Sequence, residues 1–323
     1  MDQPTISEDR HRTTGLIADP IYQLHDTGPG HPERPARYGA ILDAFSTSGI
    51  LERTLHLPSR SATEDEIALC HTRDYIATAQ ADIQSGKLEL STGDTTVSAQ
   101  SLEVALKATG GVLNAVDAVM RSQVRNAFCP IRPPGHHARP NQGMGFCIFN
   151  NIAVAARYAQ RHYGLQKVLI ADWDVHHGNG TQDTFYEDGS VFFFSTHQWP
   201  LYPGTGPANE TGSGDGKDST MNRPFAAGAG RQEVLGAFQN DLRRAADAFK
   251  PDLVLISAGF DSRIGDPLGG FTLTDDDFRD LTTVMLEIAD QHANGRLVSV
   301  LEGGYNLSGL ASAATAHVES LLA

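Results

Sequence analysis

Acidic and imidazole side chains alternate in the stretch Asp172-Trp-Asp-Val-His-His-Gly-Asn-Gly180, which directly follows an apolar run. In extended backbone, successive side chains point to opposite faces, so Asp172, Asp174 and His176 are expected to share one face. A further carboxylate, Asp261, follows another apolar run. Asp174, His176 and Asp261 offer three ligands and leave one position open, which is typical of catalytic zinc. Because the set is rich in oxygen, its ligand types also suit Fe(II), Co(II) or Mn(II).

Two adjacent histidines, His136 and His137, follow Pro133-Pro-Gly135, a sequence that favours a turn presenting both imidazoles to one site. Asp172 is a candidate to orient one imidazole through its ring N–H, and Asn179 is a candidate for the other. Imidazoles held in this way act as general bases and acids. The pair therefore indicates proton transfer beside the metal.

A tyrosine and an aromatic pair complete the set of candidate site residues. Tyr305 follows Gly303-Gly304, a turn that can place a phenol over the metal to donate to a developing oxyanion. Gly145-Phe146 and Tyr202 suit an aromatic slot, because glycine lets a substrate chain approach and rings cover its methylenes. Core packing is the alternative role for both rings.

Composition limits the class of protein that carries these residues. The 323-residue chain is 40% hydrophobic and 20% charged, which suffices for a sizeable core, and it has no run of 18 apolar residues. The formal net charge of −14 disfavours nucleic-acid binding and mildly favours cationic substrates. Neither a nucleic acid nor a membrane is expected as a partner.

The polar residues 1–13 lack the apolar segment of a secretory signal, so they predict a disordered or loosely attached tail on a cytoplasmic protein. Cys70, Cys129 and Cys147 are odd in number and form no Cys-x-x-Cys pair. This usage favours reduced, buried thiols over a disulfide framework or a thiolate zinc site.

Short apolar runs alternate with amphipathic stretches along the chain. The predicted strands, most of them continuously apolar as in strands covered on both faces, are residues 14–18, 126–131, 167–171, 190–196, 252–258 and 296–301. The predicted helices are residues 35–48, 98–120, 151–163, 231–248 and 274–291. This alternation predicts one α/β domain with a mainly parallel sheet flanked by helices. The glycine-rich residues 203–230 are expected to form one long surface loop.

Clusters of polar, chemically competent residues follow five of the predicted strands. The clusters begin at Arg132, Asp172, Ser195, Ser257 and Glu302. In open parallel sheets the carboxyl ends of the strands share one edge, where ligands bind. We therefore expect the five clusters to converge on one site.

These motifs, taken in order, resemble the zinc-dependent histone deacetylase and acetylpolyamine amidohydrolase family. The matching segments are His31-Pro-Glu-Arg34, Arg132-Pro-Pro-Gly-His-His137, Gly145-Phe-Cys147, Asp172 to Gly180, Ala258-Gly-Phe-Asp-Ser262, Asp266-Pro-Leu-Gly-Gly270 and Glu302-Gly-Gly-Tyr305. The resemblance implies the arginase-deacetylase α/β fold, with one deacetylase domain over residues 14–323. Asn179 stands where class I members carry Asp, which makes the chain similar to class II and bacterial members.

The resemblance also implies a role for each residue. Asp174, His176 and Asp261 would hold one zinc ion, and His137 would act as general base and then general acid. His136, backed by Asp172, would be an electrostatic partner, and Tyr305 would stabilise the oxyanion.

Structural potassium is a further implied cofactor. A first potassium site near the zinc would use the residues that match the family's, namely Asp172, Asp174, His176, Ser195 and Thr196. A second, peripheral site would involve Phe185, Asp188 and Val191.

The family implies an acyl-lysine peptide or an acetylated polyamine as substrate. Members that prefer acetylpolyamines often carry an acidic gatekeeper where this chain has Leu268, which favours acyl-lysine. Glu89 and Asp94 are carboxylates that could lie at the channel mouth and keep the polyamine alternative open. An arginase-like dinuclear manganese hydrolase and a non-catalytic acetyl-amide binding module are remaining alternatives, and homo-oligomerisation is left open.

Overall fold

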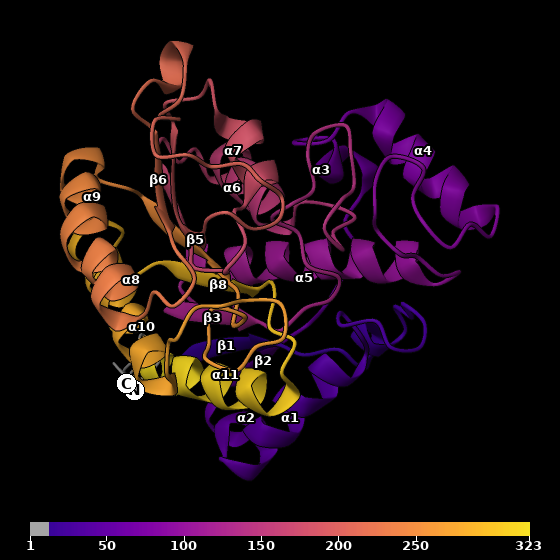
Figure 1. Cartoon of the computed structure of the whole chain (residues 1–323), viewed down its shortest axis with the longest axis horizontal. Helices are drawn as coiled ribbons and strands as arrows, with labels where there is room; N and C mark the ends of the chain where they lie inside the picture. Colours follow the sequence, from indigo (N-terminus) through magenta and orange to yellow (C-terminus); the bar gives the residue numbers. More distant parts are fainter. Residues whose placement is uncertain (1–12) are drawn as a thin grey trace, which may run out of the picture.

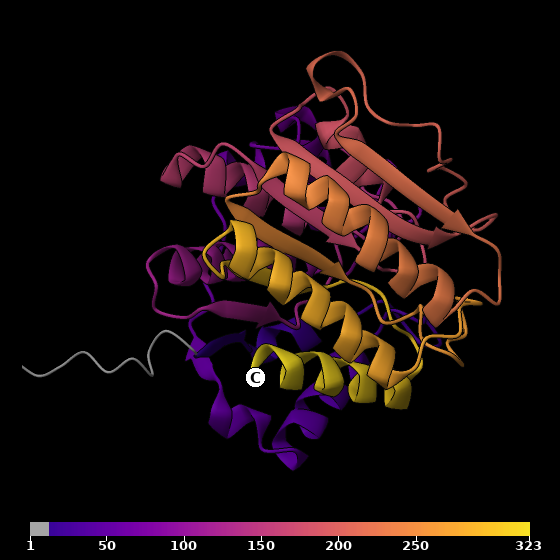
Figure 2. The same ribbon diagram turned by 90° about the vertical axis from the view of Figure 1, so that its left-hand side faces the viewer.

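One parallel sheet organises the molecule. The computed structural model describes residues 13–323, so the tail expected at residues 1–13 lies, except for Thr13, outside the described residues. Eight strands follow the order β2-β1-β3-β8-β7-β4-β5-β6, and each neighbouring pair is parallel. Helices cover both faces of the sheet (Figures 1 and 2). The predicted single α/β domain is confirmed.

The six predicted strands are present, and the two strands at the sheet edges, β2 and β6, were not predicted. The strands are β1 (Thr14–Ile17), β2 (Leu55–Leu57), β3 (Asn126–Cys129), β4 (Val168–Asp172), β5 (Val191–Gln198), β6 (Thr220–Phe225), β7 (Leu253–Ala258) and β8 (Leu297–Leu301). The expectation of one surface loop over residues 203–230 is wrong, because β6 lies within it. This strand was not predicted because it lacks a continuous apolar pattern: it contains Asn222, Arg223 and Pro224. A strand can contain proline at the edge of a sheet, which is where β6 lies.

Each predicted helix is present, although one is interrupted. The helices are α1 (Ala36–Thr47), α2 (Ile50–Arg53), α3 (Glu64–Ile67), α4 (Arg73–Gln84), α5 (Ser101–Met120), α6 (Asn151–Tyr163), α7 (Asn179–Phe185), α8 (Arg231–Ala237), α9 (Arg243–Phe249), α10 (Asp275–His292) and α11 (Leu307–Leu321). A π-helical segment, η4 (Phe238–Leu242), joins α8 to α9, and η2 (Pro20–Gln23) and η3 (Gly214–Gly216) are short 3₁₀ turns.

Alternate residues of the central strands face two apolar cores. Val168 and Ile170 of β4 pack in the core that includes α5 and α6. Leu169 and Ala171 pack in the core that includes α8, α10 and α11. Burial on both faces explains why these strands are continuously apolar in sequence.

The three cysteines are buried free thiols, as expected from their number and spacing. Within residues 13–323 no helix combines the length and apolar character that a membrane crossing requires.

Candidate active site

The sheet order brings the predicted site segments together. Strands β3, β8, β7, β4 and β5 are consecutive neighbours, and the five polar clusters lie at or beyond the carboxyl-terminal ends of these strands. Because all the strands are parallel, their carboxyl ends lie at one edge of the sheet (Figure 1). The predicted convergence is confirmed.

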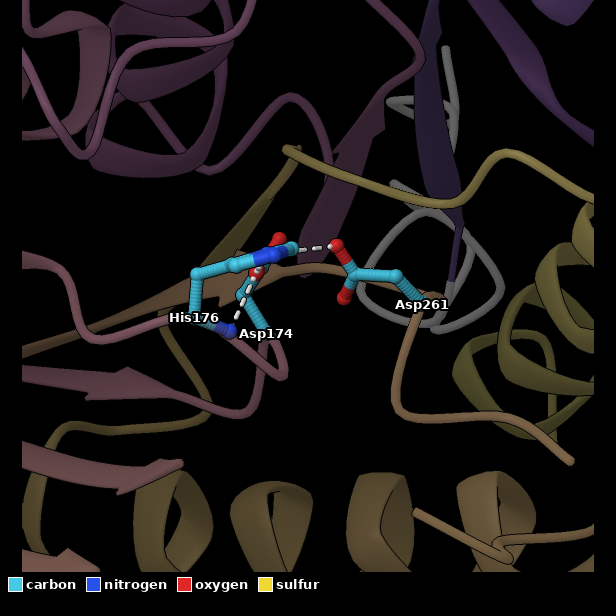
Figure 3. Close-up of side chains that lie close together, drawn as sticks. All are labelled: Asp174, His176 and Asp261. Carbon is cyan, nitrogen blue, oxygen red and sulfur yellow. Dashed lines mark hydrogen bonds and ion pairs between the residues drawn. The ribbon is translucent and has the colours of Figure 1, made fainter. Parts of the chain in front are cut away.

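The candidate metal ligands lie within reach of one ion. Asp174, His176 and Asp261 are buried, and each offers one ligand atom within 4.8 Å of the others. The His176 Nδ1 atom is 3.1 Å from Asp174 Oδ1 and 3.1 Å from Asp261 Oδ2 (Figure 3). Figure 3 shows Asp261 entering from a separate loop, opposite the other two side chains.

The expectation of extended backbone from Asp172 to His176 is wrong. Strand β4 ends at Asp172, and Asp174 and His176 lie in a bend and not in extended backbone. Side chains shape the bend, because Asp172 Oδ1 accepts from the Asp174 amide at 3.0 Å and Asp174 Oδ1 accepts from the His176 amide at 2.9 Å. Asp174, His176 and Asp261 lie together as predicted, whereas the backbone at residues 174–176 does not have the predicted conformation.

Electrostatics and close packing both fit a cation at this position. Burial, and then the neighbouring Asp174 charge, raise the pKa of the Asp261 carboxyl to about 7. Two buried carboxylates ionise together only when positive charge neutralises them, which a divalent ion supplies. Glycine is required beside them, since a Cβ on Gly259 would lie 2.1 Å from Asp174 Oδ2 and one on Gly303 would lie 2.0 Å from Asp261 Oδ2.

The two adjacent histidines have different partners. His136 Nδ1 is 2.9 Å from Asp172 Oδ2, and His137 Nδ1 is 2.8 Å from Asn179 Oδ1. Burial opposes protonation of His136, but the Asp172 and Asp174 charges overcome it and raise the pKa of its imidazole. Burial lowers the pKa of His137 well below its ordinary value, with the His136 charge adding to the effect. His137 is therefore the neutral imidazole, and its Nδ1–H donates to the Asn179 amide oxygen.

Tyr305 lies beside these groups on a constrained turn. Its backbone amide donates to Asp266 Oδ2 at 2.7 Å, and the preceding Gly304 has a φ of +119°, which favours glycine. The Arg37 guanidinium carbon is 5.0 Å from the centroid of the Tyr305 ring. Burial raises the pKa of the Tyr305 phenol well above its ordinary value, so the hydroxyl stays protonated and able to donate.

A cavity of about 310 Å³ leads to the metal ligands. The four residues proposed for the substrate slot, Gly145, Phe146, Tyr202 and Leu268, all line this cavity. The other lining residues are Asp94, His137, His176, Leu201 and Tyr305. The Tyr202 hydroxyl is 3.4 Å from Asp94 Oδ1, and its ring stands nearly perpendicular to that of His137. Glu89 is exposed and absent from this lining.

The residues assigned to the first potassium site are neighbours. Ser195 on β5 pairs with Asp172 on β4, which places Ser195 and Thr196 beside the bend that holds Asp174 and His176. The Ser195 hydroxyl is 2.9 Å from His197 Nδ1, and the buried Thr196 hydroxyl has no hydrogen-bond partner among the described residues.

The residues assigned to the second potassium site lie at the end of α7 and the start of β5. The Asp188 amide donates to the Phe185 carbonyl at 3.0 Å, and the Val191 amide donates to the Asp188 carbonyl at 3.5 Å. The Asp188 carboxylate also forms an ion pair with Arg157.

Three positions in or near the motifs were not assigned a function from the sequence: Arg37, Asp266 and Glu302. Their side chains hold the catalytic turns through contacts between distant segments. A charged side chain that is buried indicates such a role, but burial is known only from the folded structure.

Comparison with known proteins decides the family. A family model described as the histone deacetylase domain matches residues 31–321. The chain belongs to the histone deacetylase family. As a member of this family it is a deacetylase, a hydrolase whose buried Asp174, His176 and Asp261 form a metal-binding group.

Relatives of this histone deacetylase family member include archaeal and animal proteins. A probable deacetylase of Archaeoglobus fulgidus is 37% identical over 298 residues, covering 92% of this chain and 82% of the relative. Polyamine deacetylase HDAC10 of Mus musculus is 41% identical over 327 residues, covering 98% of this chain and 47% of the relative. The crystal structure of the HDA15 HD domain has a TM-score of 0.91 at 38% identity, covering 96% of this chain and 89% of that one.

Proposed function

We propose that this protein is a zinc-dependent amidohydrolase that removes acetyl or other short acyl groups from acyl-lysine side chains. The observation that carries the proposal is the cavity, in which a chain passing Phe146 and Tyr202 reaches His137, His176 and Tyr305. Rings on the walls suit the methylenes of a lysine side chain. At the position where polyamine-preferring members often carry an acidic gatekeeper, the residue that lines this cavity is Leu268.

Asp174, His176 and Asp261 would hold the zinc ion. Bound zinc polarises a carbonyl and lowers the pKa of water, which is the chemistry that hydrolysis of an unreactive amide needs. Structural potassium is proposed at Asp172, Asp174, His176, Ser195 and Thr196, with a second ion at Phe185, Asp188 and Val191. The buried Thr196 hydroxyl, which has no hydrogen-bond partner within residues 13–323, supports the first of these assignments.

The protein's own side chains would move the protons and stabilise charge. His137 is neutral and keeps Nε2 free because its Nδ1–H donates to Asn179, so it accepts the proton of water and later passes it to the leaving amine. His136, paired with Asp172, supplies positive charge beside the developing oxyanion. The protonated Tyr305 hydroxyl donates to that oxyanion.

An acetylpolyamine is the second candidate substrate, and Asp94 favours it. This carboxylate lines the cavity beside Tyr202, where it can pair with a distal ammonium group of a polyamine. The relative from Mus musculus is named a polyamine deacetylase. Of the remaining alternatives, a dinuclear hydrolase predicts two metal ions per chain, whereas the described residues contain one metal-ligand group. A non-catalytic binding module predicts no acetate release.

The first experiment compares kcat/KM for an acetyl-lysine peptide, N-acetylputrescine and N8-acetylspermidine with zinc-loaded enzyme. A clear excess for the peptide supports the acyl-lysine proposal, and a clear excess for the polyamines replaces it with a polyamine amidohydrolase. Chelation should abolish acetate release and added zinc should restore it. Acetate release that persists in the metal-free protein would contradict the metal-dependent mechanism.

The Asp94→Asn variant separates the two substrate classes. With an acetylpolyamine, loss of the carboxylate charge should lower kcat/KM by up to about fivefold, because an exposed ion pair contributes up to about 1 kcal/mol. With an uncharged peptide, the Asn oxygen still accepts hydrogen bonds and the change should be smaller. Glu89→Gln is the matched control, since Glu89 is an exposed carboxylate outside the cavity lining.

A further inference from the structure

A buried glutamate outside the proposed reaction holds the turn that carries both histidines. Glu302, directly after β8, is fully buried. Its Oε2 atom accepts from the Gly135 amide at 2.6 Å and from the His136 amide at 3.1 Å. Its Oε1 atom accepts from the Ser257 hydroxyl at 3.0 Å. One carboxylate thus connects the loop that follows β3 with the carboxyl-terminal ends of β7 and β8, and these three strands are neighbours.

The rest of the turn is held from other directions. The His136 carbonyl accepts from the amides of Gly180 and Thr181 at 3.0 and 3.2 Å, and Asn151 Nδ2 donates to the Pro133 carbonyl at 3.2 Å. The Gly135 and His136 amides find their acceptor in Glu302. Without it, two adjacent buried donors lose their acceptor, which is unfavourable because a buried amide cannot replace that hydrogen bond with one to water.

The backbone around Glu302 is itself tied to the other parts of the site. Its carbonyl accepts from Arg37 Nη2 at 2.6 Å, and the following Gly303 amide donates to Asp174 Oδ2 at 2.8 Å. Tyr305 lies two residues beyond Gly303. The glutamate therefore links the histidine turn to a metal ligand and to the tyrosine turn through a short path of hydrogen bonds.

We propose that Glu302 is a positioning residue, which sets His136 and His137 at the correct distance from the metal ligands and Tyr305 by binding two backbone amides of their turn. The proposal rests on the proposed deacetylase function, because turnover is one of its readouts. The length of the Glu302 side chain, which lets its oxygen reach the two amides, matters more for this role than its charge. A side chain of the same length should substitute better than a shorter one of the same charge.

Two variants separate reach from charge. Glu302→Gln keeps the length and an acceptor oxygen, whereas Glu302→Asp keeps the charge and retracts the carboxylate by one C–C bond. We expect kcat to fall about 100-fold for Glu302→Asp, since misplacement by about 1 Å has an effect of this size, and less for Glu302→Gln. KM and the metal content per chain should change little in both variants.

Hydrogen exchange gives a readout that does not depend on the reaction. The Gly135 and His136 amides should exchange faster in Glu302→Asp than in the wild-type protein, with Glu302→Gln between them. Asp252→Ala is the matched control: Asp252 Oδ2 accepts from two adjacent amides, Gln166 and Lys167, at 2.9 Å each, next to the amino-terminal ends of β4 and β7. This control should leave kcat and exchange of the histidine turn unchanged.

The proposal is overturned if Glu302→Asp retains more turnover than Glu302→Gln, or if exchange at Gly135 and His136 is the same in all proteins. Equal losses of kcat in Asp252→Ala would also overturn it, because they would reflect general destabilisation. If the wild-type protein releases no acetate from any substrate, the proposed function fails. The exchange measurement still decides the role of Glu302 in that case.

Discussion

His136 and His137 are adjacent, but they have different protonation states because their hydrogen-bond partners differ. A carboxylate, Asp172, accepts from His136 and favours the imidazolium form of that ring. A neutral amide, Asn179, accepts from His137 and gives no such stabilisation. Burial then keeps His137 neutral. A proton acceptor and a fixed positive charge thus arise side by side, with their ring centroids 4.0 Å apart.

Tyr305 is the residue whose single hydroxyl can be tested most cleanly. Tyr305→Phe keeps the ring that packs 5.0 Å from the Arg37 guanidinium and removes only the proposed oxyanion donor. We expect kcat to fall about 10²- to 10³-fold, as for loss of an oxyanion-hole donor, with metal content unchanged. The measurement is steady-state acetate release together with metal analysis of the purified variant. Near-normal turnover would rule out the assigned role.

Glycines at the strand ends allow two acidic ligands to approach one another. Gly303, after β8, lies where a Cβ would come within 2.0 Å of Asp261 Oδ2 and 2.6 Å of Asp174 Oδ2. Gly303→Ala must therefore displace at least one carboxylate. We expect metal affinity to fall about 10- to 100-fold, the range found when groups supporting a metal ligand are changed. Competition with a chromophoric chelator measures this directly.

Gly236→Ala is the control for that substitution. Gly236 lies in α8, and a Cβ there would meet no atom within 4 Å. Alanine is also the better helix former, so stability should be kept or slightly increased while metal affinity stays unchanged. Equal metal affinity in the wild-type and Gly303→Ala proteins would show that the two carboxylates do not bind the metal as proposed.

The elements also show how far local sequence determines the site. β4 and β7 are continuously apolar because both faces are buried, so they and the polar clusters after them could be predicted. β6 could not be predicted, because this proline-containing edge strand is not continuously apolar. The contact of Glu302 with the histidine turn depends on β8 lying between β3 and β7, and no local pattern encodes that order. The prediction of extended backbone at residues 174–176 was wrong because the Asp172 and Asp174 carboxylates accept hydrogen bonds from backbone amides and bend the chain.

At the scale of the whole molecule, buried ionisable groups link folding to pH. Burial lowers the pKa of His25 and His71 to about 4 and that of His317 to about 3. Between about pH 6.5 and these values, the unfolded chain binds protons that the folded chain does not. The stability that these three histidines contribute is therefore present above about pH 6.5 and falls as the pH decreases through this window. Within this window each such histidine lowers the free energy of unfolding by up to about 1.4 kcal/mol per pH unit, which is large beside a typical total of about 5–15 kcal/mol.

His71 is the member of this group whose contribution can be isolated. Its Nδ1–H donates to the Arg139 carbonyl at 3.0 Å, and its Nε2 accepts from the Asn150 amide at 2.8 Å. Protonation of Nε2 would remove this acceptor and place two N–H donors against one another. Urea unfolding of the metal-free protein between pH 7.5 and 5 should show a falling free energy of unfolding. In His71→Gln the slope should be shallower by up to about 1.4 kcal/mol per pH unit, which corresponds to one proton fewer. The metal-free form is needed because protonation of the metal ligands would release the ion over a similar pH range. An unchanged slope in the variant would show that His71 does not contribute to the acid sensitivity of the fold.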